Sequence, residues 1–410
     1  MISEDLTGII ELGNIKIKCL IFKIKSDGTA EILSSSITPS DGIHNDVIVN
    51  LTKASNAIRT CISQAEKKIK VSLKKINIVF EQPEFLCTKF SKHKKIDGSK
   101  IDKADIEFLL SEAKKQLILN DKNQSIIHIF NHNYIVDKKN FIEEPIGVYA
   151  DTLFHEMTFI SAPKNNLKNI RQVFMDCDLE IEKLISRTFA LGIKVLNNND
   201  FNNGAVLINL DFEKISLGLF KNLALVHSIT IPIGTNHISK DISKVCSLDL
   251  EESDLILRNI DFSLENNQNI FDENNYLKKE FFINSSIRKV SKKLILDIVK
   301  ARLDEIFNKL KKQLIIPSFK LNSLISYFIL AEDSKFENIE KYSKNFFGTN
   351  LKRIDKNDYE NESNLEKNFV SSLGALKLIK DGWETEAIPE IGEKTVKKMG
   401  IISKIFRNFK

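Results

Sequence analysis

The sequence predicts an α/β protein of two lobes, and three observations lead to that prediction. Apolar, β-branched runs alternate along the chain with segments that carry apolar residues at helical spacing. A strand–turn–strand pattern occurs once in each half, at Thr7–Ile24 and at Gly204–Phe220. The 410 residues are enough for two or more hydrophobic cores. We therefore expect an internal duplication with one hairpin in each lobe.

The composition argues against several classes of function. The 60 basic and 55 acidic residues are nearly balanced, and no basic run is interleaved with aromatic residues, so we expect no nucleic acid partner. No run of 18 apolar residues occurs, so no segment is expected to span a bilayer, and the acidic N-terminus is unlike a targeting peptide. The five scattered cysteines favour buried thiols over disulfides or a metal site.

In the first half, periodicity predicts alternating helices and strands after the hairpin. The expected elements are a helix at 50–71, a strand at 74–81, a helix at 102–119, strands at 125–137 and 155–163, and a helix followed by a strand at 166–185. Asp102 is the expected N-cap of the second helix, with Asp105 in its first turn. His128 and His132 would lie about 13 Å apart along a strand, too far for a joint metal site.

The second half predicts three helices and a strand. The first helix opens at Asp249, with Glu252 as its capping-box partner. One long helix is expected at 281–314, with a stripe formed by Leu294, Ile298, Ala301 and Ile306. A strand at 324–330 and a helix at 368–382, ending at Gly382, follow. Residues 383–396 lack periodicity and predict a linker.

The last segment, 397–410, predicts an amphipathic helix without acidic residues. Its apolar side chains share an arc of roughly 160°, and cations take most of the opposite arc. Such a helix can lie in a membrane interface or dock on a core, and the loose segment before it favours the membrane. The expected membrane-binding residues are Lys398, Met399, Ile401, Ile402, Lys404, Ile405, Phe406, Arg407, Phe409 and Lys410.

These segments, in this order, resemble the FtsA family of actin-like bacterial division proteins over nearly the whole chain. Four stretches carry the resemblance: "SDGIHNDVIVNLTKASNAI" at 40–58, the long stretch at 126–170 with its Pro-Ile-Gly turn, "IPIGTNHISKDIS" at 231–243 and "KARLDEIF" at 300–307. The amphipathic tail after a linker is similar to the family's membrane anchor. Each motif alone is weak, but their order and spacing are specific.

The resemblance implies a two-lobed actin-like fold of the actin, Hsp70 and sugar-kinase superfamily, with an α+β domain inserted in the first lobe. The implied domains are the first lobe core at 1–82 and 162–200, an inserted SHS2-like domain at 83–161, the second lobe core at 201–243 and 317–380, its upper subdomain at 244–316, a linker at 381–396 and the membrane-binding helix at 397–410.

The resemblance also implies a function and partners. Members of this family polymerise at midcell on the inner face of the cytoplasmic membrane, bind anionic lipid through the tail, capture the C-terminal peptide of the tubulin-like FtsZ and recruit later division proteins. Arg302 lies where the family's Arg-x-x-Glu helix carries its basic residue, and is the expected main contact for the peptide. The weaker expected contacts are Arg288, Lys289, Lys292 and Lys293, which can equally be a solvated helix face.

The chain departs from the family at the nucleotide site. The first turn should read approximately Asp-x-Gly-Thr and here reads Glu-Leu-Gly-Asn at 11–14. The second turn, at 209–215, has lost its glycines, and side chains block the close approach of backbone to phosphate. Ala-Glu-Asp replaces the adenosine-seating glycine pair at 331–333. The residues left to hold ATP and Mg²⁺ are Glu11, Gly13, Asn14, Lys16, Asn209 and Lys214.

We therefore expect a pseudo-ATPase scaffold without catalytic residues. Two alternatives stay open at this point. A PilM-like pilus-assembly scaffold also has an inserted domain but lacks the free amphipathic tail. An ATP-dependent enzyme of the Hsp70 or sugar-kinase kind would need the glycines that the second turn lacks. A measurement of ATP binding separates the enzyme from both scaffolds, and a pull-down with the FtsZ peptide separates the scaffolds from each other.

Overall fold

A computed structural model describes residues 6–138, 140–142, 144–265, 267–315, 325–331, 336–354 and 368–387. The chain divides into two compact units. The first contains the described residues up to 204 together with 218–228 and those from 368 onward. The second contains residues 205–217 and the described part of 229–354.

Five strands form the first sheet, in the order β11-β6-β1-β2-β3. Their bounds are β1 Leu6–Glu11, β2 Lys16–Ile24, β3 Ala30–Pro39, β6 Lys75–Phe80 and β11 Glu180–Ser186. β1 and β2 pair antiparallel, which confirms the first hairpin, and β1 pairs parallel with β6. A short hairpin, β4 (Ile43–His44) and β5 (Val47–Ile48), follows β3.

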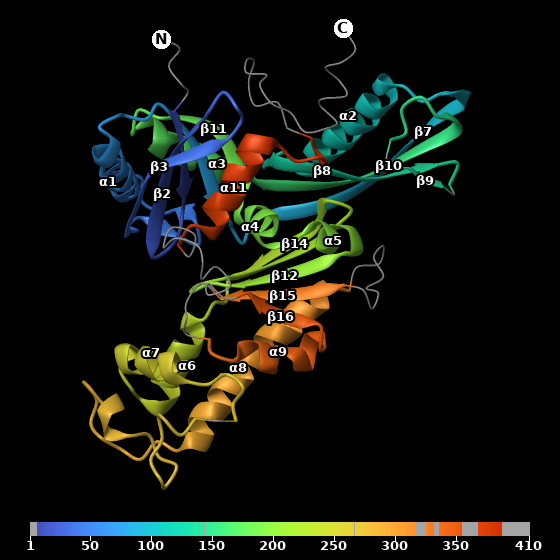
Figure 1. The fold of residues 1–410 in the computed structure, drawn as a ribbon. Coiled ribbons are helices and arrows are strands. Elements are labelled where there is room, and N and C mark those ends of the chain that lie inside the picture. Colours follow the sequence, from blue (N-terminus) through green and yellow to red (C-terminus); the bar gives the residue numbers. More distant parts are fainter. Residues whose placement is uncertain are drawn as a thin grey trace. The chain divides into compact units, whose positions relative to one another are not determined.

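Helices cover both faces of the first sheet (Figure 1). Helices α1 (Leu51–Ile69) and α3 (Lys164–Met175) bury their apolar stripes against one face, and α1 is capped by Asn50. Helices α4 (Arg187–Val195) and α11 (Val370–Asp381) pack on each other and on the strands. The stripe predicted for α1 is confirmed because Ala54, Ile58, Ile62 and Ala65 are all buried.

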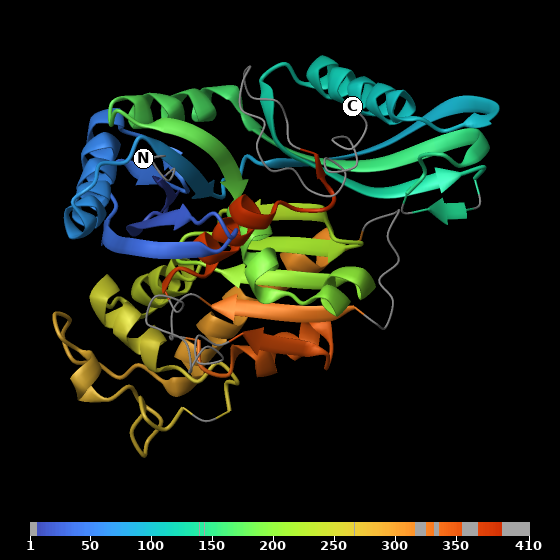
Figure 2. The same ribbon diagram turned by 45° about the horizontal axis from the view of Figure 1, so that its top comes forward.

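The inserted domain is a curved antiparallel sheet with one helix on its face (Figure 2). Its elements are β7 Leu86–Lys100, α2 Lys103–Asn120, β8 Gln124–Val136, β9 Asn140–Ile142 and β10 Tyr149–Pro163. The order β17-β8-β10-β7 ends on the short strand β17 (Glu386–Ala387), and β9 pairs with β8. Asp102 and Asp105 form a reciprocal capping box, which confirms the predicted N-cap.

The third sheet has the order β14-β13-β12-β15-β16 and contains the second predicted hairpin, β12–β13. Its strands are β12 Ala205–Leu210, β13 Ile215–Lys221, β14 Ala224–Ile231, β15 Ser326–Ala331 and β16 Leu351–Ile354. The remaining helices are α5 Asn198–Asn203, α6 Asn236–Cys246, α7 Leu250–Asn259, α8 Lys292–Gln313 and α9 Ile339–Phe347, with a 3₁₀ turn at Lys279–Phe281.

The long helix predicted at 281–314 is wrong in its first third. Helix α8 begins at Lys292 behind the N-cap Ser291. The preceding residues cannot be helical because the backbone N–H groups of 283–285 all donate to the Glu252 carboxylate. The predicted stripe is also shifted around the helix. The buried positions are Ile295, Val299, Leu303, Ile306, Phe307 and Leu310, whereas Ala301 is exposed.

Two observations bear on the domain boundaries that the resemblance implies, which stay predictions. Helix α11, which they place in the second lobe, belongs to the first unit, where Gly374 lies so close to α4 that an added Cβ would stand 1.8 Å from the Ala190 carbonyl oxygen. Within the segment predicted as a linker, Glu386 and Ala387 pair with β8. Among the described residues, no helix combines the length and the hydrophobicity that a membrane span requires.

Candidate functional site

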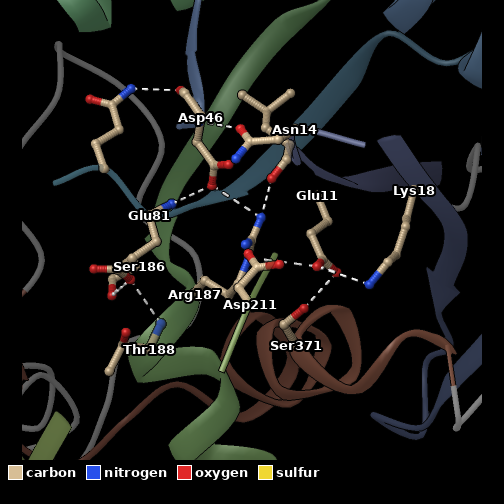
Figure 3. A network of polar contacts seen from close by, with 12 residues as sticks. Glu11, Asn14, Lys18, Asp46, Glu81, Ser186, Arg187, Thr188, Asp211 and Ser371 are labelled. Carbon is tan, nitrogen blue, oxygen red and sulfur yellow. Dashed lines mark hydrogen bonds and ion pairs between the residues drawn. The ribbon is translucent and has the colours of Figure 1, made fainter. Parts of the chain in front are cut away.

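The first turn, between β1 and β2, is built around the buried carboxylate of Glu11 (Figure 3). Lys18 Nζ lies 3.1 Å from Glu11 Oε1, and Arg187 Nε lies 3.6 Å from the same atom. The hydroxyls of Ser371 and Ser372 on α11 donate to Oε2, at 2.5 and 3.2 Å. Burial by itself raises the pKa of Glu11, but the two cations and Ser371 hold it at about 2. Glu11 is therefore a carboxylate neutralised by the protein's own side chains.

Arg187 continues the network on the other side of the turn. It is the first residue of α4, and its side chain is only 3% exposed. Its Nη2 lies 3.0 Å from Asp46 Oδ2 and also donates to the carbonyl of Leu12. The backbone N–H of Asp46 donates in turn to Asn14 Oδ1, at 3.1 Å. The first turn is thus closed by a guanidinium held between two buried carboxylates.

A second buried carboxylate network adjoins the first. Asp46 Oδ2 accepts from the backbone N–H of Glu81, which follows β6. Glu81 Oε2 accepts from the Ser186 hydroxyl and from the Thr188 N–H, at 2.8 and 2.9 Å. The Ser186 N–H donates to His128 Nε2 on the inserted sheet, at 2.9 Å. The network therefore joins the first sheet, α4 and the inserted domain.

The second turn, in the second unit, uses its own amides. The Asp211 N–H donates to the Lys214 carbonyl at 3.1 Å, and the Phe212 N–H donates to Asp211 Oδ1 at 2.7 Å. The start of α6 packs on the turn, where a Cβ on Gly234 would stand 2.3 Å from the Phe212 carbonyl oxygen. The Phe212 carbonyl accepts from the Asn236 N–H. Two of the N–H groups that a phosphate-binding turn would present are already used.

Of the residues predicted for the nucleotide site, the structure gathers Glu11, Gly13 and Asn14 around Arg187, and a Cβ on Gly13 would lie 3.9 Å from that guanidinium. Lys16 is exposed. Asn209 and Lys214 are buried in the second unit. Sequence reasoning missed Lys18, Asp46, Glu81, Arg187 and Ser371. Lys18 could have been found from the sequence, because a hairpin places a cross-strand partner opposite Glu11. The register of the β1–β2 pair shows that this partner is Lys18.

Arg302, the main residue predicted for peptide binding, is already engaged. Its Nε and Nη2 donate to the two carboxylate oxygens of Asp241 at 2.6 and 2.9 Å, and its Nη1 donates to Glu305 at 2.5 Å. Glu305 also accepts from Lys309. An acidic peptide would have to compete with a two-point ion pair. Arg302 lies nine residues beyond Lys293, which corresponds to about 180° around the helix and ~13.5 Å along it.

The other predicted cations form a different surface, which we call the basic loop, at 283–293. Arg288, Lys289 and Lys293 are exposed, and Ile283 and Ile287 beside them are 55% and 63% exposed. Glu252 fixes the start of the loop by accepting three N–H groups and the Ser285 hydroxyl. Burial raises the pKa of Glu252, but these hydrogen bonds outweigh it and bring the pKa to about 2.

Two lysines at the start of α8 also oppose its dipole. Lys292 and Lys293 occupy the first turn, which holds no acidic residue. Cations there are unfavourable by roughly 0.3–1 kcal/mol each, so an acidic ligand would be favoured at this helix end. The basic loop thus combines exposed apolar side chains with a cluster of positive charge. The residues predicted to bind membrane, within 397–410, lie outside the described residues.

Comparison with known proteins finds similarity to FtsA cell division proteins, both in the inserted domain and over most of the chain. The family model described as "SHS2 domain inserted in FTSA" matches residues 86–161. The cell division protein FtsA of Buchnera aphidicola is 26% identical over 60% of this chain and 59% of its own length. FtsA of Neisseria meningitidis is 23% identical over 73% of this chain and 71% of its own. The resemblance to FtsA is confirmed. The matched region spans about three fifths of the Buchnera FtsA.

Solved structures bear on the fold alone. A PilM–PilN type IV pilus biogenesis complex matches with a TM-score of 0.60 at 12% identity, and covers 91% of this chain and 97% of its own. MreB5 of Spiroplasma citri bound to ADP matches with a TM-score of 0.50 at 11% identity, over 92% of this chain and 97% of its own. The predicted actin-like α/β fold is therefore confirmed, with the SHS2 domain of FtsA inserted in its first half.

Proposed function

We propose that this FtsA-like chain is a peripheral membrane protein that tethers FtsZ filaments to the inner face of the cytoplasmic membrane at midcell and helps to assemble the division ring. The observation that carries the proposal is the similarity to FtsA cell division proteins, which extends over 60–74% of the chain and includes the inserted domain. The proposed partners are the FtsZ C-terminal peptide, later division proteins, anionic lipid and further copies of the chain.

We further propose that the tether works without nucleotide. The first turn of an actin-like site offers backbone N–H groups to phosphates and an acid to a hydrated Mg²⁺. Here the acid, Glu11, is engaged by Lys18 and Arg187. At the second turn, two N–H groups are spent inside the turn. Binding of Mg²⁺-ATP would have to break buried ion pairs first, so we expect weak binding and no meaningful hydrolysis.

For the FtsZ peptide, we propose the basic loop as the binding surface in preference to Arg302. FtsZ tails in this family carry acidic and apolar residues, and the loop presents both complements, through Arg288 and Lys289 and through Ile283 and Ile287. Arg302 would instead orient Asp241 and stabilise α8 against α6. This reverses the order expected from the sequence, in which Arg302 came first.

For the membrane, the proposal rests on the amphipathic pattern of 397–410. Burial of an apolar side chain contributes roughly 1.5–3 kcal/mol at most, and each cation near anionic lipid adds about 1 kcal/mol. Ordering the helix costs a good part of this, so one tail binds reversibly. Several tails on one polymer would bind much more tightly through avidity.

The experiment is a pull-down of the full chain with a synthetic FtsZ tail peptide, without nucleotide. Capture that is lost when the peptide's acidic residues are replaced supports the tether. Absence of capture at low salt overturns it and leaves the PilM-like scaffold as the alternative. An enzyme of the Hsp70 or sugar-kinase kind would be favoured by tight Mg²⁺-ATP binding together with turnover.

A further inference from the structure

The segment that follows α11 pairs with the inserted sheet. Residues 383–387, which we call the strap, cross the edge of the inserted sheet. Gly382 ends α11 with a φ of 72°, a conformation that glycine adopts without strain. Glu386 and Ala387 then pair with Phe130 and Ile129 of β8. The Asn131 N–H donates to the Thr385 carbonyl at 2.8 Å.

The strap is also held from its other side, by the turn between β13 and β14. The carbonyl of Leu223 in that turn accepts from Trp383 Nε1 at 2.5 Å and from the Thr385 hydroxyl at 2.7 Å. The Trp383 ring packs on Phe189 and Phe201, with centroid distances of 5.8 and 5.0 Å. The segment therefore lies between a sheet edge and a turn, with its aromatic residue as an anchor.

One contact of the strap joins two largely buried side chains. The side chains of Glu386 and His128 are 8% and 2% exposed, and Glu386 Oε1 lies 2.5 Å from His128 Nδ1. His128 Nε2 accepts from the Ser186 N–H, so a neutral imidazole carries its proton on Nδ1 and donates it to Glu386. Removing the carboxylate's charge weakens a charge-assisted hydrogen bond in a dry site.

We propose that the strap is a releasable segment that detaches from the inserted sheet as one piece while the rest of the fold stays intact, and that the Glu386–His128 contact holds it closed. Two of its residues join the ladder, and Trp383, Glu384 and Thr385 are half-buried or exposed. A strand this short opens at low free energy compared with the core. Gly382 supplies the hinge.

Release would change the reach of the tail. Nine residues, 388–396, separate the strap from the amphipathic segment, and nine extended residues span at most about 30 Å. Freeing 383–387 would add roughly 17 Å. This consequence rests on the proposed membrane function, but release itself does not, and it is measured without membrane.

Trp383 is the single tryptophan of the chain, so its fluorescence reports on the strap alone. The experiment follows acrylamide quenching and emission of the full chain through a urea titration, with far-UV circular dichroism in parallel. Glu386→Gln removes the charge at the buried contact, and Glu384→Gln is the matched control because Glu384 is exposed. We expect the first variant to raise the quenching constant about two-fold or more at unchanged dichroism, and the control to match the wild type.

Amide exchange gives an independent readout. In Glu386→Gln the Asn131 amide should exchange faster, while amides of the β1 ladder keep their protection. Unchanged quenching and exchange in this variant would overturn the role of the contact. If Trp383 becomes exposed only together with loss of dichroism and of β1 protection, in every variant, the strap is part of the global fold and the proposal fails.

Discussion

Replacing Arg187 by methionine tests the ion network most sharply. The substitution keeps much of the side-chain volume and removes the guanidinium that lies 3.6 Å from Glu11 and 3.0 Å from Asp46. Both carboxylates are buried, with 2% and 0% of their surface exposed. Removing one partner from a buried charged pair leaves the other charge uncompensated, which typically costs ~3–5 kcal/mol.

The pKa of Glu11 gives a second estimate of the free energy that the ion network contributes to folding. The folded state holds this pKa at about 2 against an ordinary value of 4.5. Because the folded pKa is lower, the ionised form stabilises the fold above the ordinary value, and this contribution disappears as the pH falls from about 4.5 towards 2. The difference corresponds to about 3 kcal/mol at neutral pH. Arg187 supplies part of it and Lys18 supplies another part.

Thermal unfolding of the full chain at pH 7 measures the effect. In a unit of 150–250 residues, 1 kcal/mol shifts the melting temperature by roughly 2–4 °C, so Arg187→Met should lower it by about 10 °C. Arg171→Met, an exposed position on α3, is the matched control and should change little. Combining Arg187→Met with Glu11→Gln should recover part of the loss, because the two residues interact directly. A melting temperature equal to that of the control would show that the ion pairs of Arg187 do not stabilise the fold.

Three further predictions follow from the same sites. Calorimetry should find Mg²⁺-ATP binding much weaker than at an intact actin-like site, and glycines at 211–213 should strengthen it; tight binding by the wild type would contradict the pseudo-ATPase interpretation. Arg288→Glu should weaken capture of the FtsZ peptide at low salt by about ten-fold, and more than Arg302→Glu does; the reverse order would return the dock to α8. The double variant Ile405→Glu, Phe406→Glu should no longer co-sediment with anionic vesicles, and equal pelleting of variant and wild type would place the anchor elsewhere.

The periodicity of the sequence predicted most of the secondary structure because the apolar patterns are strong. The α1 stripe, the cap at Asp102 and both hairpins depend on contacts within a few residues. The failure at 281–291 has a long-range cause. Glu252 lies about thirty positions earlier in the chain, yet its carboxylate takes up the N–H groups that a helix would need.

The candidate site also has features that depend on local sequence and features that depend on long-range contacts. The departure of both turns from the family pattern was visible in the sequence, as Glu-Leu-Gly-Asn at 11–14 and as the loss of glycines at 209–215. The residues that fill the first turn were not, since Asp46, Arg187 and Ser371 come from three separate parts of the chain. Glu386 likewise sits in a stretch without periodicity, and only its pairing with β8 places it beside His128.

The most direct test of the tether is recruitment of a fluorescent FtsZ tail peptide to anionic vesicles by the full chain in the absence of nucleotide. We predict that the peptide pellets when both the protein and the vesicles are present, that it stays in solution when either is omitted, and that adding Mg²⁺-ATP changes nothing. A peptide that stays in solution with both present, or that pellets only after ATP is added, would contradict this prediction.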